Sequence, residues 1–508
     1  MTFFPLFFNP EFTMVWLCRR AFAGYTATLY ALVLLSGCGS GTEPNGPANI
    51  TLAPPSLTFS AIGQTQQLSP TVTDQQGNPI AEATVTWTTS APAVASVSSS
   101  GAVTAAGSGS AEVTATAGSV HAVAAITVSQ TPSQVEKSQG DGQTVVAGQP
   151  VPTPPSVLVT DANHNPVPGV DVTFQVTSGR GQVTPAVVAT DNSGIAQVGG
   201  WSPGSKGSNV LTATAAGAGI SGNPVTFTAT GTSSFDIQVQ FLGSATNTQR
   251  QAFTDAAERW ESLVTGDVEN IPLQTQAEDC GPGSPALNQT IDDLLIFVTL
   301  EHIDGPGGVL GSAGPCFIRN SNNLSVVGAM IFDNADLANI EDAGLLQALI
   351  LHEMGHVLGF GSLWPTMNLL ADPSLPPATG TDPHFTGAQA ITAFNQVGGN
   401  AYTGAKVPVE NTGGEGTADG HWRESVFINE LMTGFVDLGE NPLSVVTVAS
   451  LADQGYVVNT VGADPYSLTL SLRALGGRQH RFPLGSDVLR IPIRKVDRAG
   501  RVTGYFRR

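Results

Sequence analysis

The chain has 508 residues, a length that favours roughly three or four domains. Charged residues make up only 12% of it, and 40 acidic residues against 20 basic ones give a formal net charge of −20. This acidity argues against a nucleic-acid partner and fits a soluble extracellular surface. β-Branched residues recur in alternating runs that can bury one face, so the composition is not that of a disordered chain.

The first residues carry the pattern of an export signal. Arg19 and Arg20 precede a short apolar run at residues 31–35, and small residues follow it. This order of basic, apolar and small residues is typical of a secretory signal. The run is too short to span a bilayer comfortably.

The end of that signal, Leu35-Ser36-Gly37-Cys38, resembles a bacterial lipobox, in which the cysteine is acylated and becomes the mature N-terminus. We therefore expect a lipoprotein signal peptide at residues 1–38, lipid attachment at Cys38 and a flexible tether at residues 39–49. The resemblance implies export and a lipid anchor in the bacterial cell envelope, facing the surface or the periplasm. An ordinary cleaved signal with an incidental cysteine is the alternative.

The cysteine count also fits an exported protein. Of the four cysteines, Cys18 and Cys38 belong to the signal, which leaves Cys280 and Cys316. An even pair in an exported chain predicts one disulfide. Two buried free thiols are the alternative.

Residues 50–130 are predicted to form a β-sandwich. Short alternating runs, such as residues 84–87, 93–97 and 111–115, are separated by Gly and Ser at the spacing of sandwich strands. The run from residue 85 to residue 105 resembles bacterial Ig-like domains of the second group.

Residues 131–232 are predicted to form a second module of the same class. The segments at residues 157–166, 167–174 and 189–196 resemble Ig-like repeats of the invasin and intimin type. The resemblance implies spacers that hold a working domain away from the cell envelope. Contact with surface polymers or proteins is a lesser role that such modules could have.

From residue 233 the pattern changes to a mixture of strands and helices. Alternating or apolar runs predict strands at residues 235–241, 294–300 and 326–332. Apolar residues at helical spacing predict helices at residues 248–264 and from about residue 340 to residue 358. This order of elements predicts an α+β domain.

The second of these helices carries the sequence His352-Glu-Met-Gly-His356. Residues four apart lie on one face of a helix, so the two imidazoles can hold one cation between them. Glu353 lies close enough to contact a water on the metal without being a ligand. Zinc suits this set, and the motif is a known metalloprotease signature. Gly359 is well placed to end the helix.

A zinc site of this kind needs a third protein ligand, and the nearby sequence does not offer one. The usual metzincin spacing would place a histidine at position 362, where the chain has Ser362. No glutamate lies between Glu353 and Glu410, so a nearby acidic ligand is also missing.

A more specific resemblance, to the leishmanolysin family of metzincins, covers about residues 234–461. It is carried by residues 352–360, by Gly420-His-Trp-Arg-Glu-Ser425 and by Asn429-Glu-Leu-Met-Thr-Gly434. The resemblance implies a catalytic domain at residues 233–462, with His421 as the third zinc ligand and Met432 as the apolar floor under the metal. His384 is the rival ligand, but it matches no ligand position of the family.

Residues 463–508 hold ten of the twenty basic residues of the chain. We expect this tail to be a small, basic, β-rich end piece that is exposed to solvent. Contact with acidic polymers or lipid headgroups is the alternative.

Together these observations predict two all-β Ig-like sandwiches followed by an α+β metzincin-type catalytic domain. The predicted function is that of a Zn2+-dependent endopeptidase, in which Glu353 is the general base and later protonates the leaving amine. The expected substrates are exposed proteins or peptides outside the cell. An adhesin or binding protein with a structural or inactive zinc domain is the alternative. A non-proteolytic hydrolase is a third possibility, which the Met-turn match disfavours.

Overall fold

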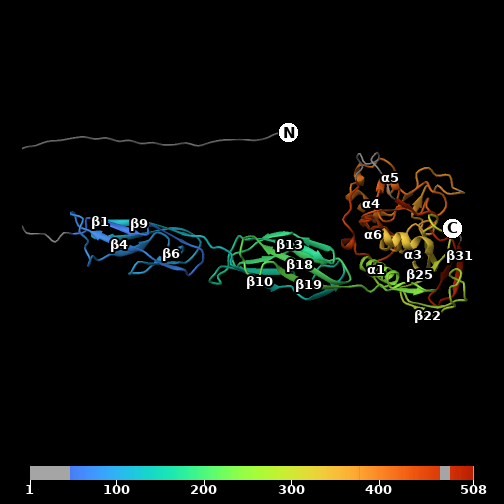
Figure 1. Cartoon of the computed structure of the whole chain (residues 1–508), viewed down its shortest axis with the longest axis horizontal. Coiled ribbons are helices and arrows are strands. Elements are labelled where there is room, and N and C mark those ends of the chain that lie inside the picture. Colours follow the sequence, from blue (N-terminus) through green and yellow to red (C-terminus); the bar gives the residue numbers. More distant parts are fainter. Residues whose placement is uncertain (1–45, 377, 469–480, 507–508) are drawn as a thin grey trace, which may run out of the picture.

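The computed structural model of the chain describes residues 46–376, 378–468 and 481–506. Two β modules lie one after the other along the molecule, and a larger region of mixed helices and strands follows them (Figure 1). The predicted export signal with Cys18, the predicted lipobox with Cys38 and most of the predicted tether lie outside the described residues. No helix within the described ranges has the length and apolarity needed to span a membrane.

The first module is built from strands β1 to β9, arranged as a four-stranded sheet β2-β9-β8-β5, a three-stranded sheet β3-β7-β6 and the pair β1-β4. Alternate side chains of the long strands β8 and β9 point into a common core, as the period of two predicts. The strands are β1 (Asn49–Ala53), β2 (Ser56–Phe59), β3 (Thr65–Gln67), β4 (Ser69–Thr73), β5 (Thr86–Thr89), β6 (Ala95–Val97), β7 (Ala102–Ala105), β8 (Gly109–Ala117) and β9 (Val120–Val128).

The second module contains a five-stranded sheet β11-β19-β18-β13-β15, a three-stranded sheet β10-β12-β16 and the pair β14-β17. Phe174, Trp201 and Phe227 fill the core between them. The strands are β10 (Gln134–Gln139), β11 (Gln143–Val146), β12 (Ser156–Thr160), β13 (Asp171–Ser178), β14 (Gly181–Thr184), β15 (Val187–Ala189), β16 (Ile195–Gln197), β17 (Gly200–Pro203), β18 (Gly207–Ala215) and β19 (Val225–Thr232).

The C-terminal region, from β20 onward, is organised by a six-stranded sheet in the order β20-β23-β25-β24-β30-β31. β20, β23 and β25 are parallel to one another, whereas β24 runs antiparallel to β25. The strands of this sheet are β20 (Ile237–Phe241), β23 (Leu294–Glu301), β24 (Gly311–Arg319), β25 (Ser325–Asp333), β30 (Ile493–Val496) and β31 (Val502–Phe506). The two-stranded pairs are β21 (Ile271–Gln274) with β22 (Asn288–Ile291), β26 (Leu370–Ala371) with β27 (His384–Phe385), and β28 (Phe435–Asp437) with β29 (Arg481–Pro483).

Both faces of the central strands β23 and β25 are covered, which explains why these two strands are almost continuously apolar. In β23, Leu294, Ile296 and Val298 pack into the larger core with the helices. Leu295 and Phe297 point the other way, into a smaller core that contains Cys280 and Cys316. These two cysteines form a disulfide with their Cα atoms 5.3 Å apart.

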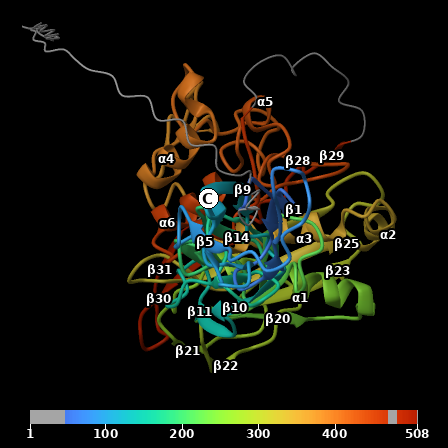
Figure 2. The same cartoon turned by 90° about the vertical axis from the view of Figure 1, so that its left-hand side faces the viewer.

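Six α-helices lie in the described part of the C-terminal region. They are α1 (Asn247–Leu263), α2 (Asn334–Asp342), α3 (Leu346–Leu358), α4 (Ala388–Gln396), α5 (Glu424–Phe427) and α6 (Val445–Gln454), with short 3-10 turns η1 (Gly399–Ala401) and η2 (Thr460–Gly462). In two perpendicular views α3 lies between α4 and α5 on one side and β22 on the other (Figures 1 and 2). α1 is capped by Thr246, whose side chain accepts from the backbone of Gln249 in a capping box.

The single helix that was predicted from residue 340 to residue 358 is wrong in its first part. The chain forms α2 and α3 instead, with a break at residues 343–345. Gly344 has a φ of 72°, a left-handed conformation that ends a helix. The apolar period continues through the break because both helices pack against the same core.

The expectation of a solvent-exposed end piece is also wrong. β30 adds to the main sheet beside β24, pairing Phe317 with Arg494 in parallel. Leu484, Ile493 and Val496 are each about 1% exposed. The C-terminal segment (residues 481–506) is therefore part of the fold of this region.

Contacts also join the second module to the C-terminal region. The Lys206 ammonium lies 2.6 Å from the Glu261 carboxylate on α1, which in turn accepts from the backbone N–H of Ile237. The side-chain amide of Asn459 donates to the carbonyl of Gly204 at 2.9 Å. The modules thus end on the base of α1, away from the face of α3 described next.

Candidate metal centre

Helix α3 carries His352 and His356 one turn apart, with their Nε2 atoms 3.0 Å from each other. The helix ends as the sequence predicts, because Gly359 has a φ of 116° and caps it in the left-handed conformation. Gly361 follows with a φ of 65°, and a Cβ there would lie 2.0 Å from the carbonyl oxygen of Gly420. This close approach brings the residue after Gly420 to the end of α3.

That next residue is His421, whose Nε2 lies 3.2 Å from His352 Nε2 and 3.1 Å from His356 Nε2. Its backbone is held on both sides, since Glu410 N–H donates to the His421 carbonyl and Trp422 N–H donates to the Met432 carbonyl. Sixty-five residues separate His356 from His421 in sequence. The fold nevertheless brings together the three histidines that the sequence predicted.

The hydrogen bonds of the imidazoles fix their tautomers. Each Nδ1 lies close to a backbone carbonyl oxygen, which can only accept, so Nδ1 carries a proton and, in the neutral ring, Nε2 presents a lone pair. The three pairs are His352 with Leu431 at 2.7 Å, His356 with Phe360 at 2.9 Å and His421 with Thr417 at 2.9 Å. Three lone pairs that converge at 3.0–3.2 Å cannot hydrogen-bond to one another and are arranged to share a cation.

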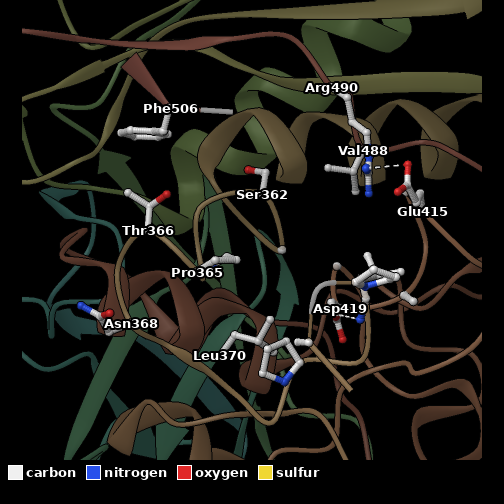
Figure 3. Close-up of a pocket in the computed structure, with 18 residues that line it drawn as sticks. Ser362, Pro365, Thr366, Asn368, Leu370, Glu415, Asp419, Val488, Arg490 and Phe506 are labelled. Carbon is white, nitrogen blue, oxygen red and sulfur yellow. Dashed lines mark hydrogen bonds and ion pairs between the residues drawn. The ribbon is translucent and has the colours of Figure 1, made fainter. Parts of the chain in front are cut away.

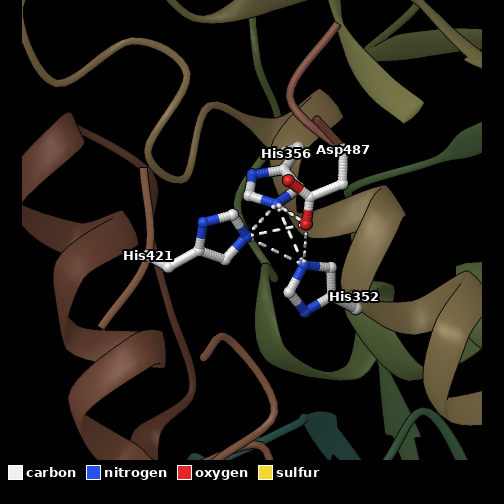
Figure 4. Close-up of side chains that lie close together, drawn as sticks. All are labelled: His352, His356, His421 and Asp487. Carbon is white, nitrogen blue, oxygen red and sulfur yellow. Dashed lines mark hydrogen bonds and ion pairs between the residues drawn. The ribbon is translucent and has the colours of Figure 1, made fainter. Parts of the chain in front are cut away.

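A fourth donor, Asp487, completes this cluster from the C-terminal segment (Figure 4). Its Oδ2 lies 2.9 Å from His421 Nε2, 3.3 Å from His352 Nε2 and 3.9 Å from His356 Nε2. We did not predict this residue from the sequence. Asp487 lies outside the recognised motifs, and it is one of three acidic residues in a tail that holds ten basic ones.

The four donors fit a tetrahedral zinc site. Zinc binds imidazole nitrogen at about 2.0–2.1 Å, so the donors of a tetrahedral site lie roughly 3.3–3.4 Å apart. The observed separations, from 2.9 to 3.9 Å, scatter around this value. All four side chains are fully buried.

The electrostatics of the centre also favour a bound cation. Both carboxylate oxygens of Glu353 and the Oδ1 of Asp487 lack a hydrogen-bond partner among the described residues, and both side chains are fully buried. Burying carboxylates without a counter-charge costs several kcal/mol or more. A divalent cation between the imidazoles and Asp487 would offset that cost.

The pKa values follow from the same burial. Burial raises the pKa of Glu353 well above its ordinary value, and the charge of Asp487 adds to the rise. Burial lowers the pKa of His356 well below its ordinary value, with His421 contributing, and burial likewise lowers the pKa of His352. Burial opposes the charged forms of His421 and Asp487 too, but their mutual attraction outweighs it. The pKa of His421 is therefore raised and that of Asp487 lowered.

Met432 lies directly against α3 at Gly355. A Cβ on Gly355 would lie 2.9 Å from the Met432 methyl carbon and 3.0 Å from its sulfur. The turn before Met432 is held by Glu430, a fully buried residue that sequence analysis did not single out. Its carboxylate accepts from Met432 N–H at 2.7 Å, and its other oxygen accepts from the hydroxyls of Ser444 and Thr447. Burial raises the pKa of Glu430.

His384, the rival ligand, lies apart from the cluster. It is in β27, partly exposed, and its Nδ1 is 2.8 Å from the Asp382 carbonyl. A second group of acidic side chains, Asp267, Asp292 and Asp293, is also close enough to share a cation, but two of the three are exposed.

A cavity of about 610 Å³ is lined by residues next to two members of the cluster (Figure 3). These are Gly420, the neighbour of His421, and Val488, the neighbour of Asp487. The lining includes Arg490, which forms an ion pair with Glu415 at 2.7 Å. The remaining walls come from the loop after α3, from Gly416, Ala418 and Asp419, and from Phe506.

Comparison with known families agrees with this geometry. Residues 285–465 match the leishmanolysin family. Residues 48–128 match the bacterial Ig-like domain of group 2, and residues 143–229 match that of group 1. The chain therefore matches the leishmanolysin family model after two Ig-like domain models, in the order that the sequence predicted. The fold class predicted from the sequence is confirmed.

The solved structures to which the chain is similar include the following three. The Yersinia pseudotuberculosis adhesin InvE matches at 20% identity over 38% of this chain and 62% of that one, with a TM-score of 0.24. Domains 1–6 of the surface layer protein SbsC match at 20% identity over 33% and 23%, with a TM-score of 0.18. The D0-D1 domain of intimin matches at 18% identity over 36% and 96%, with a TM-score of 0.15. The chain thus spans less than two thirds of the first two. No curated protein matches the chain.

Proposed function

We propose that this protein is a zinc-dependent endopeptidase with His352, His356 and His421 as metal ligands and Glu353 as the general base. The observation that carries the proposal is the convergence of three Nε2 atoms, within 3.2 Å of one another, next to the buried Glu353 carboxylate, which has no hydrogen-bond partner among the described residues. The match to the leishmanolysin family, whose members are zinc metallopeptidases, supports the choice of metal and reaction.

A zinc ion held there would supply Lewis-acid activation of a water molecule and of the scissile carbonyl. The work of this chain is to hold and move the proton. Glu353 follows His352 directly on α3, and neither of its oxygens is tied up by a neighbouring donor in the described part of the chain. The Glu353 carboxylate can therefore accept a proton from a water molecule. The resulting carboxylic acid can then donate that proton to the leaving amine.

The fixed imidazoles support this role by holding the site rigid. Each Nδ1–H is engaged with a backbone carbonyl, so the rings do not need to reorient when a cation binds. Met432 packs beneath them against Gly355. The cavity lined by Gly420 and Val488 is of a size that can accept a side chain or short stretch of a peptide substrate.

A second candidate is an adhesin or binding protein whose metal site is structural. One observation favours it: Asp487 stands where the fourth ligand of a closed site would be, and structural zinc sites have four protein ligands. The buried, unpartnered Glu353 argues against it, because a structural site needs no base.

Casein hydrolysis by the purified full chain separates the two candidates. We expect slow hydrolysis by the unaltered chain, which a chelator abolishes and added zinc restores, and faster hydrolysis when Asp487→Ala removes the carboxylate at the fourth position. A protein that binds zinc but hydrolyses neither casein nor peptides, both unaltered and with Asp487→Ala, would be the structural candidate.

We further propose that the Ig-like domains display the peptidase on the cell envelope from a lipid on Cys38. The Ig-like matches support a surface or extracellular location. Cys38→Ala should release the protein from membranes while its zinc content stays unchanged. A mature protein that begins at another residue and is soluble would contradict the anchor.

A further inference from the structure

The carboxylate that completes the metal centre comes from a segment that the peptidase motif does not include. Asp487 Oδ2 is 2.9 Å from His421 Nε2, and its side chain is fully buried. Catalytic zinc sites keep one position for water or substrate, whereas here a protein carboxylate stands at that position. The group that faces the imidazoles is a side chain and not a peptide carbonyl, so the segment is not held as a substrate would be.

The backbone around Asp487 is fastened on both sides. Before it, β29 pairs with β28, and the N–H of Leu484 donates to the carbonyl of Gly434 at 3.0 Å. After it, the N–H of Leu489 donates to the carbonyl of Ala313 at 2.8 Å. The carbonyl of Asp487 itself accepts from the N–H of Ala313 at 2.7 Å.

The residue before Asp487 has a strained backbone. Ser486 has a φ of 60°, in the left-handed region that non-glycine residues rarely adopt. It lies against Gly416, where a Cβ would come within 2.4 Å of the Ser486 Cα. Such outliers persist where the surroundings fix them, and this one turns Asp487 toward the three imidazoles.

The same segment covers the edge of the sheet. Without β30 and β31, β24 would be the edge strand of the sheet, with Ala313 beside the metal centre. Extended peptides commonly bind by adding a strand to such an edge. Here both backbone groups of Ala313 are already used by Asp487 and Leu489, in the parallel direction.

We propose that Asp487 is a fourth metal ligand and that the C-terminal segment thereby closes the metal to water and substrate, so that the chain is a latent form of the peptidase. The latency of the peptidase rests on the proposed function. The coordination of the metal by Asp487 does not depend on that function. Opening requires the Asp487 carboxylate to leave the metal, and with it the strand pairing to Ala313.

The test uses the full chain freed of metal and reloaded with cobalt(II), whose visible absorption reports the ligands. Asp487→Ala and Asp487→Asn remove the carboxylate, and Asp487→Asn keeps its size. Asp497→Ala is the matched control, because Asp497 is in the same segment and its carboxylate accepts from Ala499 and Arg501 in a local turn. Acetohydroxamate, a small metal chelator, probes whether the metal can be reached. Casein hydrolysis is measured on the zinc forms.

We expect the cobalt spectrum to change in both Asp487 variants and to stay unchanged in Asp497→Ala. Acetohydroxamate should bind the cobalt form of Asp487→Ala about tenfold or more tightly than the unaltered chain, because the carboxylate no longer competes. Casein hydrolysis should rise by about tenfold or more for the same reason.

An unchanged spectrum, or equal hydroxamate binding in the unaltered chain and Asp487→Ala, would overturn the closure. A variant that binds hydroxamate tightly but does not hydrolyse casein would instead overturn the proposed function and leave the closure standing. If Asp487→Ala fails to fold, the same measurements are made on Asp487→Asn.

Discussion

The Ig-like modules and the C-terminal region differ in the kinds of side chain that they bury. The cores of the modules are apolar, and the buried Asp161 carboxylate and Thr190 hydroxyl are hydrogen-bonded to loop backbone. The one core group there that lacks a partner among the described residues is neutral, the indole N–H of Trp201. The C-terminal region buries three imidazoles and two carboxylates at one point, with three carboxylate oxygens unpartnered among the described residues. Burying such groups costs free energy, so this arrangement is stable only if a counter-charge, such as a bound divalent cation, offsets that cost. The contrast separates a scaffold from a reactive site.

The largest effect is expected when one of the three histidine ligands is removed. His421→Ala should lower zinc affinity by more than about a hundredfold and abolish hydrolysis, since changes even in groups that only support a ligand cost about 10–100-fold. His384→Ala is the matched control and should keep both, because His384 lies outside the cluster. Zinc content after dialysis and peptide hydrolysis measure the two effects. Equal zinc content in both variants would contradict the ligand assignment.

Glu353→Gln should separate metal binding from chemistry. We expect kcat to fall by about 10²–10⁴-fold, the usual contribution of a general base, while zinc content stays unchanged. Glu258→Gln, on the exposed face of α1, should leave kcat unchanged. Loss of zinc in Glu353→Gln would mean that this residue is a ligand.

A destabilising substitution in the first Ig-like module should leave the zinc content of the C-terminal region unchanged. Phe59 is fully buried in the core of the first module, and Phe59→Ala should destabilise that module by about 3–5 kcal/mol. Val123→Ala is the control, because Val123 is 46% exposed and its truncation should cost less than about 0.5 kcal/mol. Calorimetry should show one transition lowered in Phe59→Ala, with zinc content and hydrolysis unchanged. A parallel loss of zinc would show that the regions do not fold independently.

The smallest expected effect is at the contact between α3 and the Met-turn. In Gly355→Ala, crowding against Met432 should cost about 1–3 kcal/mol, and the better helix propensity of alanine should return about 1 kcal/mol. We therefore expect a net loss of roughly 0–2 kcal/mol in chemical denaturation of the metal-free protein. Gly243→Ala, which meets no atom within 4 Å, should change stability less. A clear gain in stability at Gly355 would contradict the packing described here.

The sequence predicted the local parts of the site well, and the reasons are physical. The His352 and His356 pair lies on one helix, so spacing alone places both rings on one face. His421 was reached only through resemblance to a family, because no local rule links it to α3. The helix break at Gly344 was missed because the apolar period continues across it.

Asp487 and β24 were missed for a different reason. Asp487 acquires its role from strand pairing with Ala313, which is far away in the sequence. The residues of β24 include Gly311, Gly314 and Pro315, which weaken any strand pattern. Long-range strand pairings of this kind leave no periodic pattern in the sequence. The basic composition of the tail suggested instead that it is exposed to solvent.

Anomalous scattering at the zinc edge from crystals of the full chain tests the central claim most directly. We expect one strong peak among the Nε2 atoms of His352, His356 and His421, within bonding distance of Asp487 Oδ2. A peak only at the acidic group of Asp267, Asp292 and Asp293, or no peak in zinc-loaded crystals, would contradict it.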